Sequence, residues 1–209
     1  MKKRDIAVTK RLYLMRHAET QFNLRYLFQG WCDSSLTQRG RAQARIAGQY
    51  FVEEQIPLDH AYSSDLRRAS ETCELAVGEV LPHEQLAGLR EWNFGAFEGT
   101  SGKNFPVQFP YGDFFGAFGG ETQEELEARV IATLQDIMER PAHSNVLAVS
   151  SGDVCTLFCN LQADHSPVQI DKRAPNCGIY VYDYDEGFFS CQGLIEPDFS
   201  SLGPAPDHI

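Results

Sequence analysis

The residue pair with the clearest chemical potential is Arg16-His17, which directly follows the apolar run at 12–15. A guanidinium group is planar and can bind a phosphate through two hydrogen bonds. An imidazole can act as a nucleophile, a general base or a metal ligand. A short apolar run bounded by polar residues predicts a buried strand, and ligands of open α/β sheets bind at the carboxyl ends of strands. The pair is therefore expected at the edge of a sheet where ligands bind, although two residues alone do not define a reaction.

Other candidates for the same chemistry lie further along the chain, and two of them follow predicted strands. Arg67, in the stretch at 63–69, is placed in the first turn of a helix. Glu91 supplies a carboxylate in a partly aromatic stretch. Ser151-Gly152 form a strand-to-helix corner, where backbone N–H groups can face an anion. These residues could converge with the first pair if the strands lie side by side.

The elements that must position these residues alternate between strand and helix. Thr37 and Ser64 are the predicted N-caps of two helices. Further strands are expected at 59–63, 146–150, 179–184 and 188–192, the last two as a hairpin. Helices are expected at 38–55, from 64 through about 76, at 121–140 and at 152–161. This alternation predicts an α/β fold with a mainly parallel sheet.

Residues 100–120 break the alternation. Five phenylalanines, a tyrosine and several glycines occur there without a clear period. Such a long irregular segment predicts an insertion that folds over a site as a lid. Packing of the same aromatic residues into the core is the competing interpretation.

Composition restricts the class of protein. With 209 residues, of which 43% are hydrophobic and 22% charged, the chain has the profile of one globular domain. No apolar run approaches the ~18 residues that cross a bilayer. A net charge of −11 argues against nucleic acid as the main partner.

The chain also lacks the signals of secretion. The basic residues 1–4 are followed by Asp5 and by no long apolar core, so no signal peptide is expected. The six cysteines are scattered and lie mostly in apolar stretches, which predicts reduced thiols. A cytoplasmic protein is expected.

Three competing chemistries lack their motifs. No cysteine is followed by an arginine at the spacing of a tyrosine-phosphatase loop. Gly102-Lys103 resembles the end of a P-loop, but Phe97 replaces its first glycine and Asn104 its final Ser or Thr. No Cys-x-x-Cys or His-Glu-x-x-His pattern indicates zinc.

The order and spacing of the candidate motifs, from about residue 10 to 193, resemble the histidine phosphatase superfamily, which includes the cofactor-dependent phosphoglycerate mutases. The matching motifs are Arg16-His17-Ala18-Glu19-Thr20, Gln29-Gly30, Leu36-Thr37 with Gly40, Ser63-Ser64 with Arg67, Ala69 and Thr72, Glu91 with Gly95 and Glu98-Gly99, Gly120-Glu121-Thr122, and Asn176. The resemblance implies a phosphoglycerate mutase-like, three-layer α/β/α sandwich. Residues 1–209 would form a single domain that carries the insertion at about 100–120.

The resemblance also implies a role for each matching residue. His17 would attack phosphorus and carry the phosphoryl group as phosphohistidine. Arg16 and Arg67 would clamp the phosphoryl oxygens, with Asn23 as a further donor. Glu91 would protonate the leaving alcohol and then activate water. The other residues expected to bind phosphate or substrate are Gln29, Gly30, Ser151 and Gly152. Neither a metal nor another cofactor is implied.

From the residues alone, two of these roles have simpler alternatives. Arg67 could pair with Asp65 or Glu71 on its own helix. Glu91 could be a solvated loop charge.

Ser151 departs from the family pattern, in which the resemblance places a histidine that donates to the phosphoryl oxygens. Serine keeps one hydroxyl donor but loses reach and charge. Loss of one transition-state donor costs about 10²–10³ in rate. Three interpretations follow: partial substitution by Ser151 and a bridging water, a non-catalytic phosphate binder, or an engineered variant.

The function expected from these observations is hydrolysis of a small phosphorylated metabolite. A mutase is less favoured, because mutase relatives tend to be longer and to close the site with a C-terminal tail. A regulatory module that binds a phosphorylated ligand without turnover is the alternative from another class. The expected partner is a small-molecule phosphomonoester, and neither nucleic acid nor membrane. The oligomeric state is left open, with a homodimer as one option.

Overall fold

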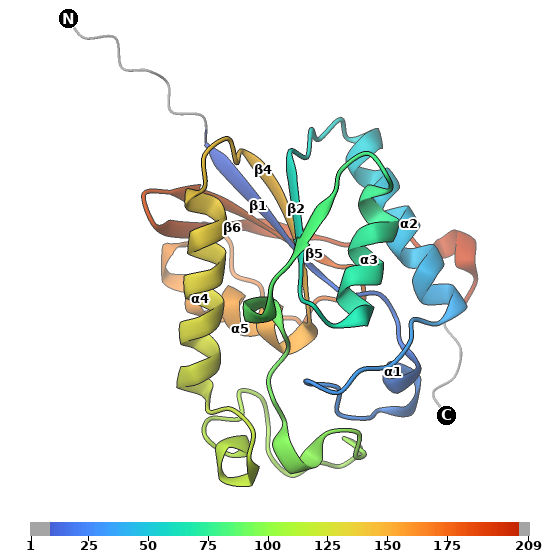
Figure 1. The fold of residues 1–209 in the computed structure, drawn as a ribbon, viewed down its shortest axis with the longest axis vertical. Coiled ribbons are helices and arrows are strands. Elements are labelled where there is room, and N and C mark those ends of the chain that lie inside the picture. Colours follow the sequence, from blue (N-terminus) through green and yellow to red (C-terminus); the bar gives the residue numbers. More distant parts are fainter. Residues whose placement is uncertain (1–8, 205–209) are drawn as a thin grey trace, which may run out of the picture.

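The computed structural model describes residues 9–204, which are arranged around one six-stranded sheet in the order β3-β2-β4-β1-β5-β6 (Figure 1). The strands are β1 (Lys10–Arg16), β2 (His60–Ser63), β3 (His83–Gln85), β4 (Asn145–Ser150), β5 (Ile179–Asp185) and β6 (Phe188–Ile195). The α-helices are α1 (Gln21–Arg25), α2 (Gln38–Glu53), α3 (Arg67–Val77), α4 (Gln123–Glu139) and α5 (Gly152–Leu161). Helices α2 and α3 cover one face of the sheet, and α4 and α5 the other, so the fold is the expected three-layer α/β/α sandwich.

Strands β1, β2, β3 and β4 pair in parallel. The hairpin of β5 and β6 adds antiparallel strands beside β1. The sheet is therefore mainly parallel, as predicted, and the hairpin makes it a mixed sheet. Because β1 and β4 run in register, with Arg16 opposite Ser150, their carboxyl ends meet at one edge.

Alternating side chains of β1 hold the layers together. Leu12 and Leu14 are fully buried and pack in the cluster that includes α4 and α5. Tyr13 and Met15 point to the other face and pack with α2 and α3. A buried leucine of this kind contributes about 2–5 kcal/mol relative to alanine. The strand that ends in the Arg16-His17 pair is thus anchored on both faces.

Hydroxyl caps set the start of two helices. Thr37 accepts a hydrogen bond from the Gly40 N–H at the start of α2, as predicted. Thr122 and Glu125 form a reciprocal capping box at the start of α4. Caps of this kind contribute about 1 kcal/mol each.

The predicted cap at Ser64 is wrong. The Ser64 N–H bonds to the Val149 carbonyl, so the chain is still extended beside β4 at this point. The N-cap of α3 is Leu66, and the helix begins at Arg67. Arg67 and Arg68 therefore both lie in the first turn of α3, and of the two only Arg68 is buried.

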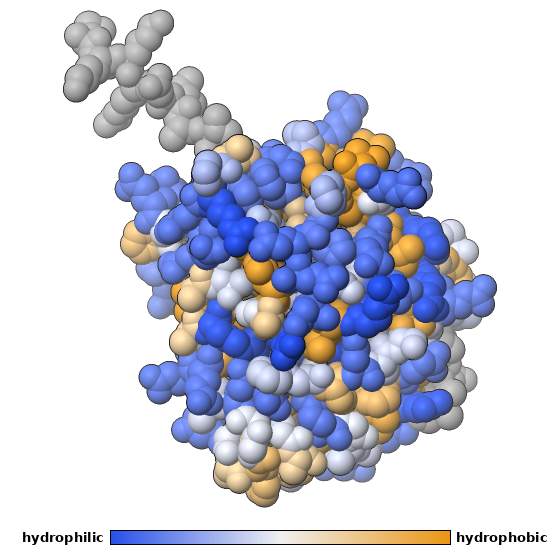
Figure 2. All heavy atoms as spheres, viewed as in Figure 1, coloured by the Kyte–Doolittle hydropathy of each residue, from blue (hydrophilic) through white to orange (hydrophobic). Residues whose placement is uncertain are grey.

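The segment at 100–120 contributes some of its aromatic residues to the core and exposes others. Phe115 is fully buried and packs against the rings of Phe28, Trp92 and Phe94, so it belongs to the core. Phe118 is 45% exposed. Figure 2 shows apolar and near-neutral residues gathered at the end of the molecule where Figure 1 places this segment.

Sequence patterns predict neither β3 nor α1. Strand β3 has three residues, and α1 buries no side chain, so neither shows a hydrophobic period. Among residues 9–204, no helix is long and apolar enough to cross a membrane. The basic residues 1–4, on which the expectation about a signal peptide rests, lie outside the described residues.

Candidate active site

A cavity of about 740 Å³ opens where β1 and β4 end. Its polar side contains Arg16, His17 and Asn23, which lie close together in the sequence, and Glu91 from a distant segment. Its apolar wall is aromatic and consists of Phe22, Tyr26, Phe28, Phe94, Phe105, Phe109 and Tyr111. Three of these rings come from the segment at 100–120, which therefore lines the site as the lid interpretation predicts.

His17 is 3% exposed and has a defined tautomer. Its Nδ1 lies 2.8 Å from the Ala18 carbonyl oxygen. Since a carbonyl only accepts, Nδ1 carries the proton and Nε2 keeps a free lone pair. Burial, followed by the charges of Arg68 and Arg16, holds the pKa of His17 well below its usual value. The imidazole is therefore neutral at pH 7, as a nucleophile must be.

Arg16 brings a cation to the same cavity. Its Nη1 donates to the Ala174 carbonyl at 2.9 Å, while its Nε is buried without a partner. Desolvation and the nearby Arg173 lower the pKa of Arg16 to about 10, so the side chain is still charged at pH 7. A buried, incompletely paired guanidinium favours binding of an anion.

Asn23 is positioned as a donor. Its side-chain oxygen accepts from the Thr20 N–H and from Asn176 Nδ2. These bonds orient the amide, so its NH₂ is the end that can donate to a ligand. Asn176 also donates to the His17 carbonyl and thereby links the two sides of the cavity.

Glu91 sits on the N-terminus of α5. Its carboxylate accepts from the backbone N–H groups of Asp153, Val154 and Trp92 at 2.9–3.1 Å. Desolvation, and then the Asp153 carboxylate, raise the pKa of Glu91 to about 7, although Arg173 and the backbone donors offset part of this. A carboxyl group that titrates near neutrality can act as both acid and base. The solvated-loop alternative for Glu91 is wrong.

The prediction that Arg67 points into the site is wrong. Its side chain is 64% exposed and pairs with Glu71 and Glu74 on its own helix. The neighbouring Arg68 is fully buried instead and lowers the pKa of His17. Arg68 donates to three loop carbonyls and to Asp33, and its Nη2 lies 3.5 Å from Ser151 Oγ. Arg68 therefore holds the loop beside the site through these hydrogen bonds and does not line the cavity.

The β4 corner places its two predicted residues differently. Ser151 is fully buried and its hydroxyl faces Arg68, so it does not line the cavity. Gly152 does line it. A Cβ at Gly152 would lie 2.5 Å from Nη2 of Arg173, so the guanidinium group lies directly against this glycine.

Gln29 and Gly30 hold the loop beside the site. The Gln29 side chain bonds to Thr20 and Ser34 at its two ends, although the residue borders the cavity. The Gly30 N–H donates to Glu98, and a Cβ at this position would lie 2.2 Å from the Trp92 carbonyl. The prediction that Gly30 binds phosphate is wrong, because its donor is already used.

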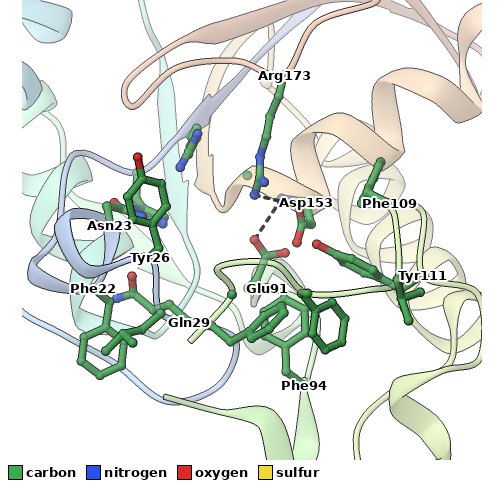
Figure 3. Close-up of a pocket in the computed structure, with 18 of the residues that line it drawn as sticks. Phe22, Asn23, Tyr26, Gln29, Glu91, Phe94, Phe109, Tyr111, Asp153 and Arg173 are labelled. Atoms are coloured by element: carbon green, nitrogen blue, oxygen red, sulfur yellow. Dashed lines mark hydrogen bonds and ion pairs between the residues drawn. The ribbon is translucent and has the colours of Figure 1, made fainter. Parts of the chain in front are cut away.

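Sequence reasoning missed two charged residues of the cavity, Asp153 and Arg173. Figure 3 shows both beside Glu91, on the side of the cavity opposite Asn23. Nη2 of Arg173 lies 2.7 Å from Asp153 Oδ1. The only sequence signal was position, since Asp153 follows the Ser151-Gly152 corner and Arg173 precedes Asn176 by three residues.

A neutral buried imidazole, a cation and a carboxyl group with a raised pKa around one cavity are the parts that an enzyme for phosphoryl transfer through histidine requires. Residues 12–196 match the histidine phosphatase superfamily (branch 1), and the chain belongs to this superfamily. Among residues 9–204, no three His, Cys, Asp or Glu side chains are grouped so that they could hold a metal ion.

Relatives carry several names. The "Putative phosphoserine phosphatase 2" of Hydrogenobacter thermophilus is 32% identical over 171 residues, 73% of this chain and 78% of that protein. The "Probable phosphoglycerate mutase GpmB" of Citrobacter koseri is 32% identical over 95% of this chain and 98% of its own. Among solved structures, Bacillus stearothermophilus YhfR is 28% identical with a TM-score of 0.75, and the match covers 92% of this chain and 99% of that one.

Proposed function

We propose that this protein is a phosphomonoester hydrolase that works through a phosphohistidine at His17. The observation that carries the proposal is the hydrogen bond from His17 Nδ1 to the Ala18 carbonyl, which leaves Nε2 unprotonated on a residue that lines the cavity. In the first step Nε2 attacks phosphorus and the bond to the leaving oxygen breaks. Arg16 and Asn23 bind the phosphoryl oxygens, and the protonated Glu91 donates its proton to the leaving alcohol.

In the second step the phosphohistidine is hydrolysed. Glu91, now ionised, takes a proton from water, and the resulting hydroxide attacks phosphorus. The P–N bond breaks, which returns the lone pair to Nε2 and releases inorganic phosphate. The pKa of about 7 for Glu91 supports both roles at neutral pH. The buried charge of Arg68 adds positive potential near His17.

The aromatic wall supports a small substrate with an apolar portion next to its phosphate. Phe105, Phe109 and Tyr111 line the cavity opposite the polar groups. The six cysteines are free, which supports a location in the reducing cytoplasm. We favour hydrolysis over transfer to a second metabolite, because hydrolysis needs only a water beside Glu91, whereas transfer requires the intermediate to be retained and rebound.

The test is trapping of the intermediate. Incubation with p-nitrophenyl phosphate and an alkaline quench should give one acid-labile phosphate at residue 17 by mass spectrometry. His17→Ala should abolish this adduct and turnover, while binding of inorganic phosphate stays within about tenfold because Arg16 is intact. The exposed His165, in the variant His165→Ala, is the matched control. Full turnover by His17→Ala would exclude the covalent mechanism.

A second candidate function is binding of a phosphorylated ligand without turnover. The observation that favours it is the burial of Ser151, which offers no donor to the cavity. If wild-type protein binds inorganic phosphate but forms no adduct at residue 17, this candidate replaces the hydrolase.

A further inference from the structure

The charged residues of the cavity are few, and one of them has no role so far. Among the described residues, Arg16 and Arg173 are the only Lys or Arg side chains that line it, against Glu91 and Asp153. A bound phosphate monoester brings close to two negative charges at neutral pH. Without Arg173, the charges of Arg16 and Asp153 would roughly cancel, and the side chains that line the cavity would supply no positive excess for a dianion.

Arg173 lies where the reacting group is expected. Its guanidinium packs against Gly152 at the first residue of α5, and a Cβ there would lie within 3.0 Å of Nη2, Nε and Cζ. Its charge lowers the pKa of both Arg16 and Glu91, so it is close to the predicted clamp and to the predicted acid. Figure 3 shows the side chain entering the cavity toward Asp153 and Glu91.

The N–H donors of Arg173 are still available. Its side chain is 47% exposed. Although Nη2 is 2.7 Å from Asp153 Oδ1, the contact lacks hydrogen-bond geometry, and this buried oxygen has no hydrogen-bond partner. Nη1 and Nη2 of Arg68, in contrast, are engaged with loop carbonyls and Asp33, although its buried Nε has no partner, and Arg68 does not line the cavity.

We propose that Arg173 is a further phosphoryl-binding residue, which forms the second arm of a clamp with Arg16, and that Asp153 is its internal counter-ion. This inference rests on the proposed function. In the free protein Asp153 holds the guanidinium over the start of α5. In the complex the same guanidinium donates to a phosphoryl oxygen, and the proximity of two cations, unfavourable in the empty cavity, becomes favourable around a dianion.

The test measures equilibrium binding of inorganic phosphate and orthovanadate by calorimetry at pH 8, where Glu91 is largely ionised. Arg173→Met should weaken binding of both anions about 10- to 100-fold, as expected for a lost charge-assisted hydrogen bond. Arg173→Lys should recover part of the loss. Lys172→Met is the matched control, because this substitution removes the same charge from the chain. Lys172 is exposed and pairs with Glu196.

Asp153→Asn separates a binding role from a structural one. Both substitutions break the same ion pair, so a purely structural pair predicts weaker anion binding in each. The clamp predicts opposite signs: weaker binding in Arg173→Met, and about 3- to 10-fold tighter binding in Asp153→Asn, because Asp153 no longer competes for the guanidinium. Asp153→Asn and Arg173→Lys decide the question even if Arg173→Met does not fold.

Equal affinities in Arg173→Met and Lys172→Met, with an adduct at residue 17 in the wild type, would overturn this inference and leave the proposed function intact. The inference would also be overturned if Arg173→Met bound phosphate and vanadate as the wild type does and lost affinity only for a phosphoester with a second acidic group. Arg173 would then bind that second group and not the phosphoryl group. Weak anion binding in Arg173→Met, with no adduct in the wild type, would keep the clamp and remove the hydrolase. No phosphate or vanadate binding by the wild type would overturn both.

Discussion

The carboxyl ends of β1 and β4 lie side by side, yet they equip the cavity in different ways. At the end of β1, consecutive residues supply the cation and the imidazole, and both face the cavity. At the end of β4, Ser151 turns inward, and the cavity wall is built by Gly152, by Glu91 on the helix N-terminus and by Arg173. The β1 corner thus supplies reactive side chains from its own sequence, whereas the β4 corner mainly positions side chains that come from other segments.

The largest effect that would sharpen this contrast is expected for Glu91→Gln. The amide keeps the size of the side chain but cannot serve as a proton donor of the required acidity at the β4 corner. Turnover of an alkyl phosphate such as glycerol 2-phosphate should fall about 10²–10⁴-fold, because a poor leaving group needs the acid. Turnover of p-nitrophenyl phosphate, whose leaving group is good, should fall much less. Equal losses on both substrates would argue that Glu91 is not the acid.

The next effect concerns stability at the corner that follows β2. Arg68→Met leaves buried carbonyls and Asp33 without their donor, so the free energy of unfolding should fall by about 3–5 kcal/mol. Arg67→Met, its exposed neighbour, should change it by less than about 0.5 kcal/mol. Urea unfolding of both variants gives the comparison. A reversed order would restore the inward orientation predicted for Arg67.

A histidine at the β4 corner tests whether that corner can be made to resemble the β1 corner. Ser151→His should raise turnover at least about tenfold. One donor to the transition state raises the rate about 10²–10³-fold, and the displacement of Arg68 by the larger side chain offsets part of this gain. Ser151→Ala, the control, should change turnover less than about threefold, because the hydroxyl accepts a hydrogen bond from Arg68 and does not line the cavity. An unchanged or lower rate in Ser151→His would show that the corner does not need a histidine.

The smallest effect is a pH dependence of the two half-reactions. The pKa of Glu91 is raised from 4.5 to about 7, mainly by desolvation. Phosphorylation of His17 needs the protonated acid, so its rate should fall to about half near pH 7 and continue to fall above it. Dephosphorylation needs the ionised form and should fall below pH 7. Single-turnover measurements follow the phosphorylation rate and chase measurements follow the dephosphorylation rate, both from about pH 5.5 to 8.5. A dephosphorylation rate that stays constant over this range, as expected for a carboxylate with a pKa near 4.5, would indicate that Glu91 is solvated.

The sequence by itself determined the alternation of strands and helices and most of the β1 corner. Apolar periods and caps such as Thr37 act between residues close in the chain, so they can be read without a fold. Arg16 and His17 could be placed at the sheet edge because they directly follow an apolar run. The approach of Glu91 to this edge was implied only by the family resemblance, because its partners, the N–H groups of α5, are about 60 residues away.

Only the tertiary structure decided between Arg67 and Arg68 and found the pair of Asp153 and Arg173. Neighbouring residues of a helix point about 100° apart. The packing of α3 buries Arg68 on the same face as Thr72 and leaves Arg67 exposed to solvent. Arg173 meets Asp153 because the loop before β5 folds back over α5, and no local pattern records such a contact. Local periodicity can be read from the chain, whereas the side chains that meet across a sheet edge are determined by the packing of whole elements.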